Sequence, residues 1–137
     1  MINSINPTAQ VVNANSNVLF TVDRIRTNSC KCGGWLAHDL GSGLFTLTKS
    51  GVYYVAYNAN ITSADTGAAS LTLDVNGEEL QGTESVYTIA AANAVGHVGN
   101  GALIQVPCGG SYTISLNNNS ALALDVTNPN IVIWRMA

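Results

Sequence analysis

Apolar and polar residues alternate along most of this chain, and the spacing typical of helices is almost absent. The clearest alternation is in residues 52–62. One face of that stretch carries Tyr53, Val55, Tyr57, Ala59 and Ile61. A period of two places alternate side chains on opposite faces of a β-strand, so this stretch is predicted to be a strand with one buried face. The same pattern predicts strands over residues 18–26, 44–48, 69–75, 78–80, 85–90, 95–106, 111–116, 121–126 and 130–136.

Turn-forming residues separate these predicted strands. Asn76-Gly77 lies between two alternating segments and is the strongest short signal for a two-residue β-hairpin. Residues 107–110 (Pro-Cys-Gly-Gly) and 117–119 (three asparagines) are predicted turns by composition. The only helix candidate, residues 89–94, is short and has no charged face. Many short strands with frequent turns predict an all-β domain, either an antiparallel sandwich, a jelly roll or a barrel.

The chain has 137 residues, the size of one domain, and no internal repeat or linker divides it. Residues 1–17 precede the first clear strand and carry no charge. We interpret them as an arm, attached to a sandwich of residues 18–137, that adds a strand to the exposed sheet edge of a partner. The apolar residues assigned to this contact are Ile2, Ile5, Val11 and Val12. The alternatives are a disordered terminus or a first strand of the sandwich itself.

The chain carries unusually little charge. Charged residues make up 9% of it, whereas ordinary soluble domains contain about 25%. The polar residues are instead 16 Asn, 11 Ser and 12 Thr. Five Lys and Arg against eight Asp and Glu give a net charge of −3, so we expect no binding to nucleic acid. A hydrophobic content of 47% excludes a disordered chain.

A run of 40 residues, from Ser85 to Leu124, contains no charged side chain. Its most apolar part, residues 86–106, is long enough to cross a bilayer, but glycines, asparagines, a histidine and a glutamine interrupt it. We therefore expect no membrane span. We expect instead strands buried on both faces, one face against the domain core and one against another subunit. The residues assigned to this subunit interface are Val95, His97, Leu103, Ile104, Val106 and Trp134.

Two parts of the sequence carry a family pattern. The first is Phe45-x5-Gly51-x-Tyr53-x-Val55-x-Tyr57. The second is the pair of segments 101–106 and 111–116, joined by a glycine turn, followed by the final segment 131–136. These stretches resemble the globular head of complement C1q, in which Phe stands where this chain has Val55 and the last strand closes the domain. That family shares the jelly roll of the tumour-necrosis-factor (TNF) superfamily, so the resemblance implies a ten-strand antiparallel jelly-roll sandwich that assembles as a homotrimer.

The resemblance also suggests a role. Members of this family usually carry a collagen-like stalk, and this chain has no Gly-X-Y repeat. Heads without a stalk resemble bacteriophage virion proteins, whose trimers decorate capsids or tip fibres. The resemblance therefore implies a non-enzymatic structural protein of the virion, a capsid decoration or head-fibre protein, whose partners are its own copies and a major capsid protein lattice. The alternative is a receptor- or glycan-binding head of a tail fibre or bacterial surface protein. The N-terminus lacks the features of a signal peptide, so we expect synthesis in the bacterial cytoplasm.

Candidate metal ligands are sparse. Cys30 and Cys32, with His38 nearby and Cys108 far along the chain, offer zinc-binding atoms. Paired zinc cysteines are usually separated by about two to four residues, and here the separation is one. We favour free cysteines that are dispensable for the fold over a zinc site or a disulfide. Asp65, followed by Thr-Gly, is one carboxylate without a regular calcium loop and is predicted to lie in a turn.

His97 is the other candidate ligand. Around a threefold axis, three copies would bring three imidazoles together to bind an anion or a metal. We favour the alternative, a histidine hydrogen-bonded within the interface, because buried polar groups are normally satisfied. The chain has no Gly-x-Ser-x-Gly sequence and no phosphate-binding glycine loop before a helix, so the sequence predicts no enzyme and no cofactor.

Overall fold

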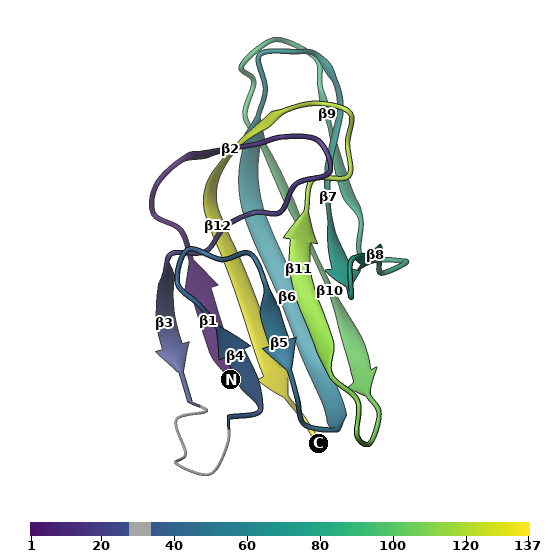
Figure 1. Cartoon of the computed structure of the whole chain (residues 1–137). Helices are drawn as coiled ribbons and strands as arrows, with labels where there is room; N and C mark the ends of the chain where they lie inside the picture. The colour runs from purple at the N-terminus through teal and green to yellow at the C-terminus, as the bar shows by residue number, and fades with distance from the viewer. Residues whose placement is uncertain (28–33) are drawn as a thin grey trace.

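The computed structural model describes residues 1–27 and 34–137, which form a sandwich of two antiparallel β-sheets (Figure 1). In the described part of the chain, every regular element is a strand. The all-β antiparallel sandwich predicted from the alternation is therefore confirmed. The strands are β1 (Ile2–Ile5), β2 (Gln10–Val12), β3 (Val22–Arg26), β4 (Leu36–His38), β5 (Phe45–Leu47), β6 (Gly51–Thr62), β7 (Gly67–Val75), β8 (Glu78–Glu79), β9 (Ser85–Ile89), β10 (Gly96–Val106), β11 (Tyr112–Asn117) and β12 (Leu124–Arg135).

The first sheet has the order β10-β6-β12-β1-β3, with β2 added beside β12. All 11 residues of β10 pair with β6. On its other side β6 pairs with β12, with a register shift between Thr127 and Asn130. These two ladders place β6 between β10 and β12. Residues 53–58 of β6 pair without interruption with β10 on one side and with residues 130–135 of β12 on the other. Side chains from the three strands therefore form rows across this part of the sheet.

The second sheet has the order β4-β5-β11-β7-β8, with β9 beside β7. The predicted hairpin joins β7 to β8. Asn76 and Gly77 have φ values of 53° and 81°, and a type I′ turn requires positive φ at both central residues. The prediction of a tight Asn-Gly hairpin is therefore confirmed.

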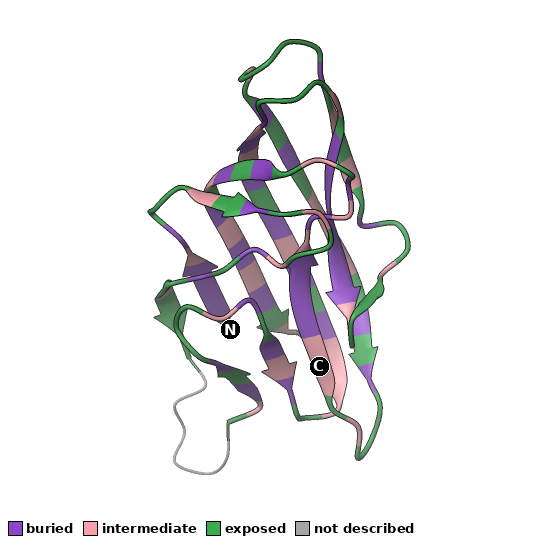
Figure 2. Ribbon diagram, turned by 45° about the horizontal axis from the view of Figure 1, so that its top comes forward, coloured by how far each residue is buried: buried purple, intermediate pink, exposed green. Residues whose placement is uncertain are grey.

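The core lies between the two sheets, and burial alternates along the strands that enclose it (Figure 2). All five residues predicted for the buried face of β6 are at most 3% exposed: Tyr53, Val55, Tyr57, Ala59 and Ile61. The rings of Phe20 and Phe45 meet edge to face with centroids 5.5 Å apart. The Tyr57 hydroxyl lies 2.7 Å from the Thr83 carbonyl oxygen. Burial, and next the negative charge of Glu84, raise the pKa of Tyr57, so the hydroxyl stays a donor inside the core.

Residues 1–17 are part of the sandwich, so the interpretation of this segment as a separate arm is wrong. β1 lies between β12 and β3 and pairs with both, and β2 pairs with β12. Of the four residues assigned to a partner, Ile2 and Val12 are buried in the core, Ile5 is half-buried, and Val11 is 68% exposed. The physical reason is that β12 has an unsatisfied edge that β1 completes within the same chain. The alternative, a first strand of the sandwich, is correct.

Further segments differ from the sequence prediction. The predicted strands 121–126 and 130–136 form the single strand β12. Residues 18–21 do not continue the strand, because the backbone of Phe20 bonds to Gly41 and Ser42 of a loop rather than to a ladder. Val18 and Phe20 are buried, whereas Val22, at the start of β3, is 39% exposed. β4 was not predicted, since three residues are too few to show a period.

The helix candidate forms no helix. Residues 90–94 make a turn after β9, in which Asn93 has a φ of 63°. A left-handed residue in this position ends any helical path, and the segment had neither the length nor the charged face that a surface helix needs.

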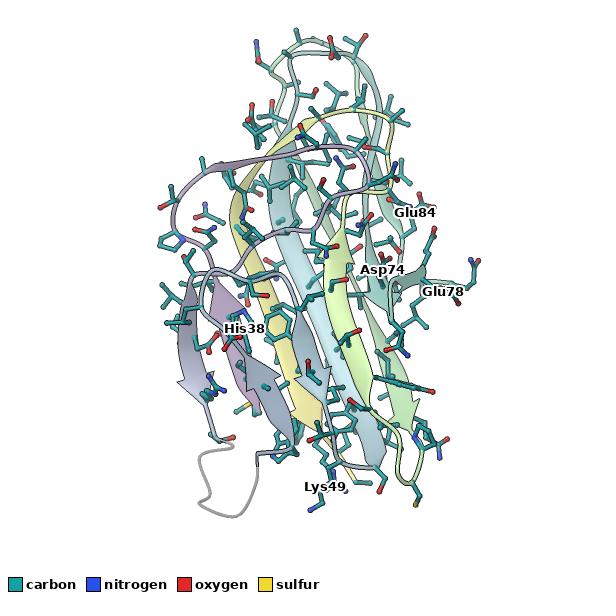
Figure 3. The ribbon with its side chains drawn as sticks, viewed as in Figure 1. His38, Lys49, Asp74, Glu78 and Glu84 are labelled. Atoms are coloured by element: carbon teal, nitrogen blue, oxygen red, sulfur yellow. The ribbon has the colours of Figure 1, made fainter. Side chains whose placement is uncertain are left out.

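Acidic residues gather along the edge of the second sheet, where Figure 3 labels Asp74, Glu78 and Glu84. Asp74 on β7 pairs in register with Glu79 on β8, and it is 8% exposed. Burial, and next the negative charge of Glu79, raise the pKa of Asp74. A carboxyl group whose pKa is raised by folding lowers the stability of the fold when it is ionised.

Replacing Ile2 by Ala is expected to lower the free energy of unfolding by about 2–5 kcal/mol, because the change empties a fully buried position between β12 and β3. The matched control is Val11→Ala, at a position 68% exposed, which is expected to change stability by no more than about 0.5 kcal/mol. Urea denaturation followed by circular dichroism measures both. Small and equal effects would show that residues 2–5 lie outside the cooperative fold.

Replacing Asp74 by Asn is expected to raise the thermal unfolding temperature at pH 7, because it removes a carboxylate that the fold disfavours. The gain is present above the folded-state pKa of Asp74, declines as the pH falls through that value, and vanishes below the ordinary value of 3.8. Glu78→Gln, at an exposed position on β8, serves as the charge-matched control. Thermal scans at pH 7 and pH 3 measure the difference, and an equal gain at both pH values contradicts this account.

Candidate functional site

The outer face of the first sheet carries three exposed apolar side chains in one row. Leu103 on β10 pairs in register with Tyr54 on β6, which pairs in register with Trp134 on β12. These three side chains are 63%, 39% and 52% exposed. We call them the apolar row. Large apolar side chains that adjoin one another on a surface indicate a contact site for another protein.

The residues next to the apolar row have smaller side chains, so the surface beside the row does not protrude. The next row along the same strands is Gly101, Ala56 and Val132. A Cβ atom at Gly101 would lie 3.0 Å from the Val55 carbonyl oxygen and 3.2 Å from the Tyr54 hydroxyl. The Tyr54 side chain therefore extends over Gly101. A glycine at this position leaves room for that ring and gives a shallow apolar surface.

The outer face of the second sheet is polar along β7 and β11. There the residues that alternate with the core positions of β7 and β11 are Ser70, Thr72, Asp74, Thr113, Ser115 and Asn117. Several of them bond to neighbouring loops; the Ser70 hydroxyl, for example, donates to Asn119 Oδ1 over 2.7 Å. Hydroxyl and amide groups of this kind are satisfied without a partner protein. The two outer faces therefore differ, and the first sheet offers the apolar one.

Two of the six residues assigned to the subunit interface face the core of their own domain. Ile104 is 5% exposed and Val106 is 1% exposed, and both point between the sheets. Their assignment to the interface is wrong, because alternate residues of β10 lie on opposite faces and Leu103 takes the outer one. Val95, just before β10, is 65% exposed.

His97 lies on the outer face of β10, near the start of that strand. Its Nδ1 atom lies 3.0 Å from Oδ1 of Asn60, its partner in register on β6. The hydrogen bond that we favoured over an anion or metal site is therefore present. The position of His97 within a subunit interface stays a prediction.

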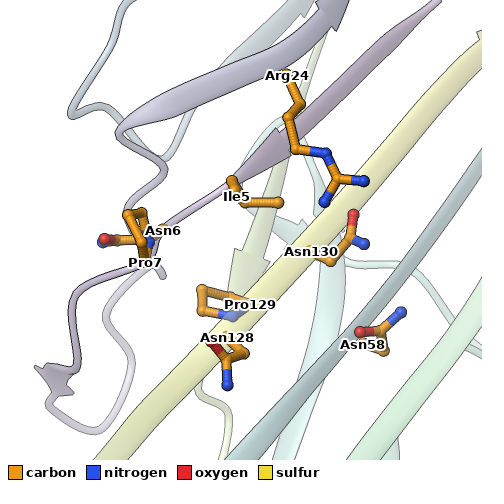
Figure 4. A pocket seen from close by; sticks show the side chains of 8 residues that line it. All are labelled: Ile5, Asn6, Pro7, Arg24, Asn58, Asn128, Pro129 and Asn130. Atoms are coloured by element: carbon orange, nitrogen blue, oxygen red, sulfur yellow. The ribbon is translucent and has the colours of Figure 1, made fainter.

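A cavity of about 310 Å³ opens on the same sheet where β12 is irregular (Figure 4). Asn128 has a φ of 49°, and Pro129 has no backbone N–H to donate to the ladder. The register of β12 on β6 shifts between Thr127 and Asn130. The residues that form most of the wall are Ile5, Pro7, Arg24, Asn58, Asn128 and Asn130. The sequence pattern did not predict this pocket; the available signal was a proline within an otherwise strand-like segment.

The structure brings a serine, an aspartate and a histidine together between β1, β3 and β4. The Ser4 hydroxyl donates to Asp23 Oδ1, and His38 Nδ1 lies 2.8 Å from the same oxygen. Arg26 pairs with the other carboxylate oxygen at 3.3 Å. A catalytic triad needs the hydroxyl next to the histidine, whereas here the carboxylate lies between them. Ser4 and His38 are also buried, so the cluster acts as a link between the sheets.

The metal candidates find no support in the described residues. Cys108 is exposed and free, whereas Cys30 and Cys32 lie outside the described residues. Within residues 1–27 and 34–137, no three His, Cys, Asp or Glu side chains are grouped to hold a metal ion. Asp65 lies in the connection between β6 and β7, as expected. Nor does the part of the chain described here contain a helix with the length and apolarity needed to cross a membrane.

No protein-family model matches the chain, and no curated protein matches its sequence. Solved structures match its fold over almost its whole length. The globular domain of zebrafish complement 1qA has a TM-score of 0.75 at 14% identity, covering 99% of this chain and 96% of that one. Eiger TNF from S. frugiperda has a TM-score of 0.70 at 10% identity, with 99% and 92% covered. Murine APRIL at pH 8.5 has a TM-score of 0.67 at 9% identity, with 98% and 97% covered. The chain therefore has the jelly-roll fold of the C1q globular domain and of TNF, as its sequence resemblance implied.

Proposed function

We propose that this chain is a non-enzymatic structural and binding module that assembles as a homotrimer through the outer face of its first sheet. The observation that carries the proposal is the apolar row of Leu103, Tyr54 and Trp134. Each apolar square ångström removed from water contributes about 25 cal/mol, and aromatic side chains contribute the largest areas. An exposed row of this kind is stabilised by burial against another copy.

Assembly through this face has a low desolvation cost. β10 carries no charged residue, and its only ionisable side chain, His97, is already bonded to Asn60. Buried charges are costly unless they are paired, so an uncharged edge strand is suited to an interface. A ring of three copies would bring three apolar rows around one axis and close the assembly, which prevents further growth.

For the assembled trimer we favour a role as a virion component, a decoration protein on a capsid lattice or a head-fibre protein. The low charge and the many Asn, Ser and Thr residues support this role. Residues 2–5 and 10–12 are paired within the sandwich, so contact with a lattice would use the surface of the trimer and not these residues. A receptor- or glycan-binding head is the second candidate, and the polar cavity beside Arg24 favours it.

The purified protein is expected to have a mass of about 43 kDa, three times that of the 14.3 kDa chain, in light scattering after size exclusion. Leu103→Asp is expected to reduce the mass to that of one chain while the circular dichroism spectrum stays that of a folded β protein. The reason is that Leu103 is exposed in the single chain, so its replacement disturbs the assembly rather than the core.

Two matched variants make this test specific. Leu44→Asp changes a leucine that is 48% exposed next to β5 of the second sheet, and it is expected to leave the mass unchanged. Ile104→Asp places a carboxylate in the core and is expected to unfold the chain. A single-chain mass for the unmodified protein at micromolar concentration contradicts the proposal.

The virion role predicts binding to a repetitive shell. The assembled protein is expected to co-sediment with capsid shells that lack their decoration protein and not with shells that already carry it. Saturation at a fixed ratio to the capsid subunits would indicate a lattice site. If the protein instead adheres to host cells and does not sediment with shells, the receptor-binding role replaces the capsid role.

A further inference from the structure

Arg24 differs from the other described arginines because its guanidinium has no partner in the described part of the chain. Arg26 pairs with Asp23, and the guanidinium of Arg135 donates to the Ser50 carbonyl oxygen over 2.8 Å. Among residues 1–27 and 34–137, no hydrogen bond or ion pair involves the Arg24 side chain. An unpaired guanidinium keeps all five of its N–H donors available.

Arg24 owes its position to an irregular ladder. On β1, Asn3 pairs with Ile25 and the next residue, Ser4, pairs with Asp23, so Arg24 has no partner in the register. This is the geometry of a β-bulge, in which the extra residue is released from the ladder and its side chain is re-aimed. The second irregularity, between Thr127 and Asn130 of β12, lies around the same cavity. Bulges are over-represented next to functional sites.

The cavity wall carries further unused polar groups. Asn58 on β6 and Asn128 on β12 line the space, and neither side chain has a hydrogen bond within the described residues. Figure 4 shows the Arg24 guanidinium extending toward Asn130. Asn130 Oδ1 accepts a hydrogen bond from the Asn3 amide, which fixes the orientation of Asn130. Each free amide offers one acceptor and two donors.

The charge, the polar groups and the volume of the cavity indicate which kind of ligand it fits. None of the residues lining the cavity is acidic, so Arg24 gives it a positive charge although the whole chain has a net charge of −3. A guanidinium fork matches a carboxylate with two parallel hydrogen bonds. Asn58 and Asn128 are suited to hydroxyl groups, and Ile5, Pro7 and Pro129 give an apolar wall. A volume of about 310 Å³ is at the lower end of the usual range for small-molecule sites.

We infer that this cavity binds a carboxylate carried by a small hydroxylated molecule, such as the acid group of a sugar acid, with Arg24 holding the carboxylate. The same chemistry has a second source, because a Glu or Asp side chain of another copy also ends in a carboxylate. The cavity lies on the face proposed for assembly: Asn58 is four residues from Tyr54 along β6, or about 13 Å. The experiment therefore has one readout for each source.

The first readout is titration of the unmodified protein with glucuronic acid at pH 7 and constant ionic strength, followed by isothermal calorimetry and by NMR. Glucose, which has no carboxylate, is the matched neutral ligand. Arg24→Gln is expected to lower the affinity for glucuronic acid at least tenfold. Arg24→Lys keeps the charge without the planar fork and is expected to give an intermediate loss. Lys49→Gln removes a positive charge at an exposed position outside the cavity and is expected to leave the affinity unchanged.

The second readout is the mass of the same variants in light scattering. Loss of glucuronic acid binding in Arg24→Gln at an unchanged mass supports a site for a free acid. A fall in mass for Arg24→Gln but not Lys49→Gln, with no binding of the free acid, supports a site for the carboxylate of another copy. Equal binding of glucose and glucuronic acid overturns the inference, as does an Arg24→Gln variant that matches the unmodified protein in both readouts. Because the proposed trimer is tested separately with Leu103→Asp, failure of one proposal is distinguishable from failure of the other.

Discussion

The register in which β6 pairs with β10 and β12 is the constraint on which the rest of this structure depends. If β6 slipped by one residue relative to its neighbours, its core side chains would move to the outer face and its outer side chains to the core. In the observed register Tyr53 and Tyr57 point into the core. Tyr54, which directly follows Tyr53, points to the outer face of the sheet. The same register places Leu103 and Trp134 on either side of Tyr54. Both the core and the apolar row thus follow from one pairing.

Where the ladders lose this regularity, the surface gains a cavity. Asn128 and Pro129 interrupt β12, and Arg24 is left out of the pairing between β1 and β3. Each irregularity gives up backbone hydrogen bonds that a regular sheet would make. At the irregularities, polar side chains from neighbouring strands line one shared cavity. The first sheet therefore combines the exposed apolar row with a recess lined by Arg24, Asn58 and Asn128.

Polar contacts as well as the apolar core hold the two sheets in place. His38 comes from β4 of the second sheet and contacts Asp23 on β3 of the first. Its ring stacks on Phe45 with centroids 4.2 Å apart, which ties the polar contact to the core. The side chain of Asp23 is 8% exposed and is satisfied from three sides, by His38, Ser4 and Arg26. A buried carboxylate with this many partners links the N-terminal strands to the sandwich.

The fold class was accessible from the sequence, because a strand that buries one face must alternate in polarity, and β6, β7, β10 and β11 do so over most of their length. The Asn76-Gly77 turn was accessible for a similar reason, since its positive φ values suit few other residue pairs. Both signals are local. They depend on residues that are neighbours in the chain.

The neighbours of each strand, and the face that it presents, were decided by the tertiary structure. Leu103 and Ile104 are both large and apolar, and residue type does not reveal that one is 63% exposed and the other 5%. Residues 2–5 (Ile-Asn-Ser-Ile) do not alternate in polarity, so they do not identify themselves as a strand, and only the open edge of β12 makes them one. Arg24, Asn58 and Asn128 are far apart in sequence and meet only where two bulges coincide. Alternation along a strand specifies two faces, but which of them is covered depends on contacts between segments distant in the chain, and those contacts leave no local pattern.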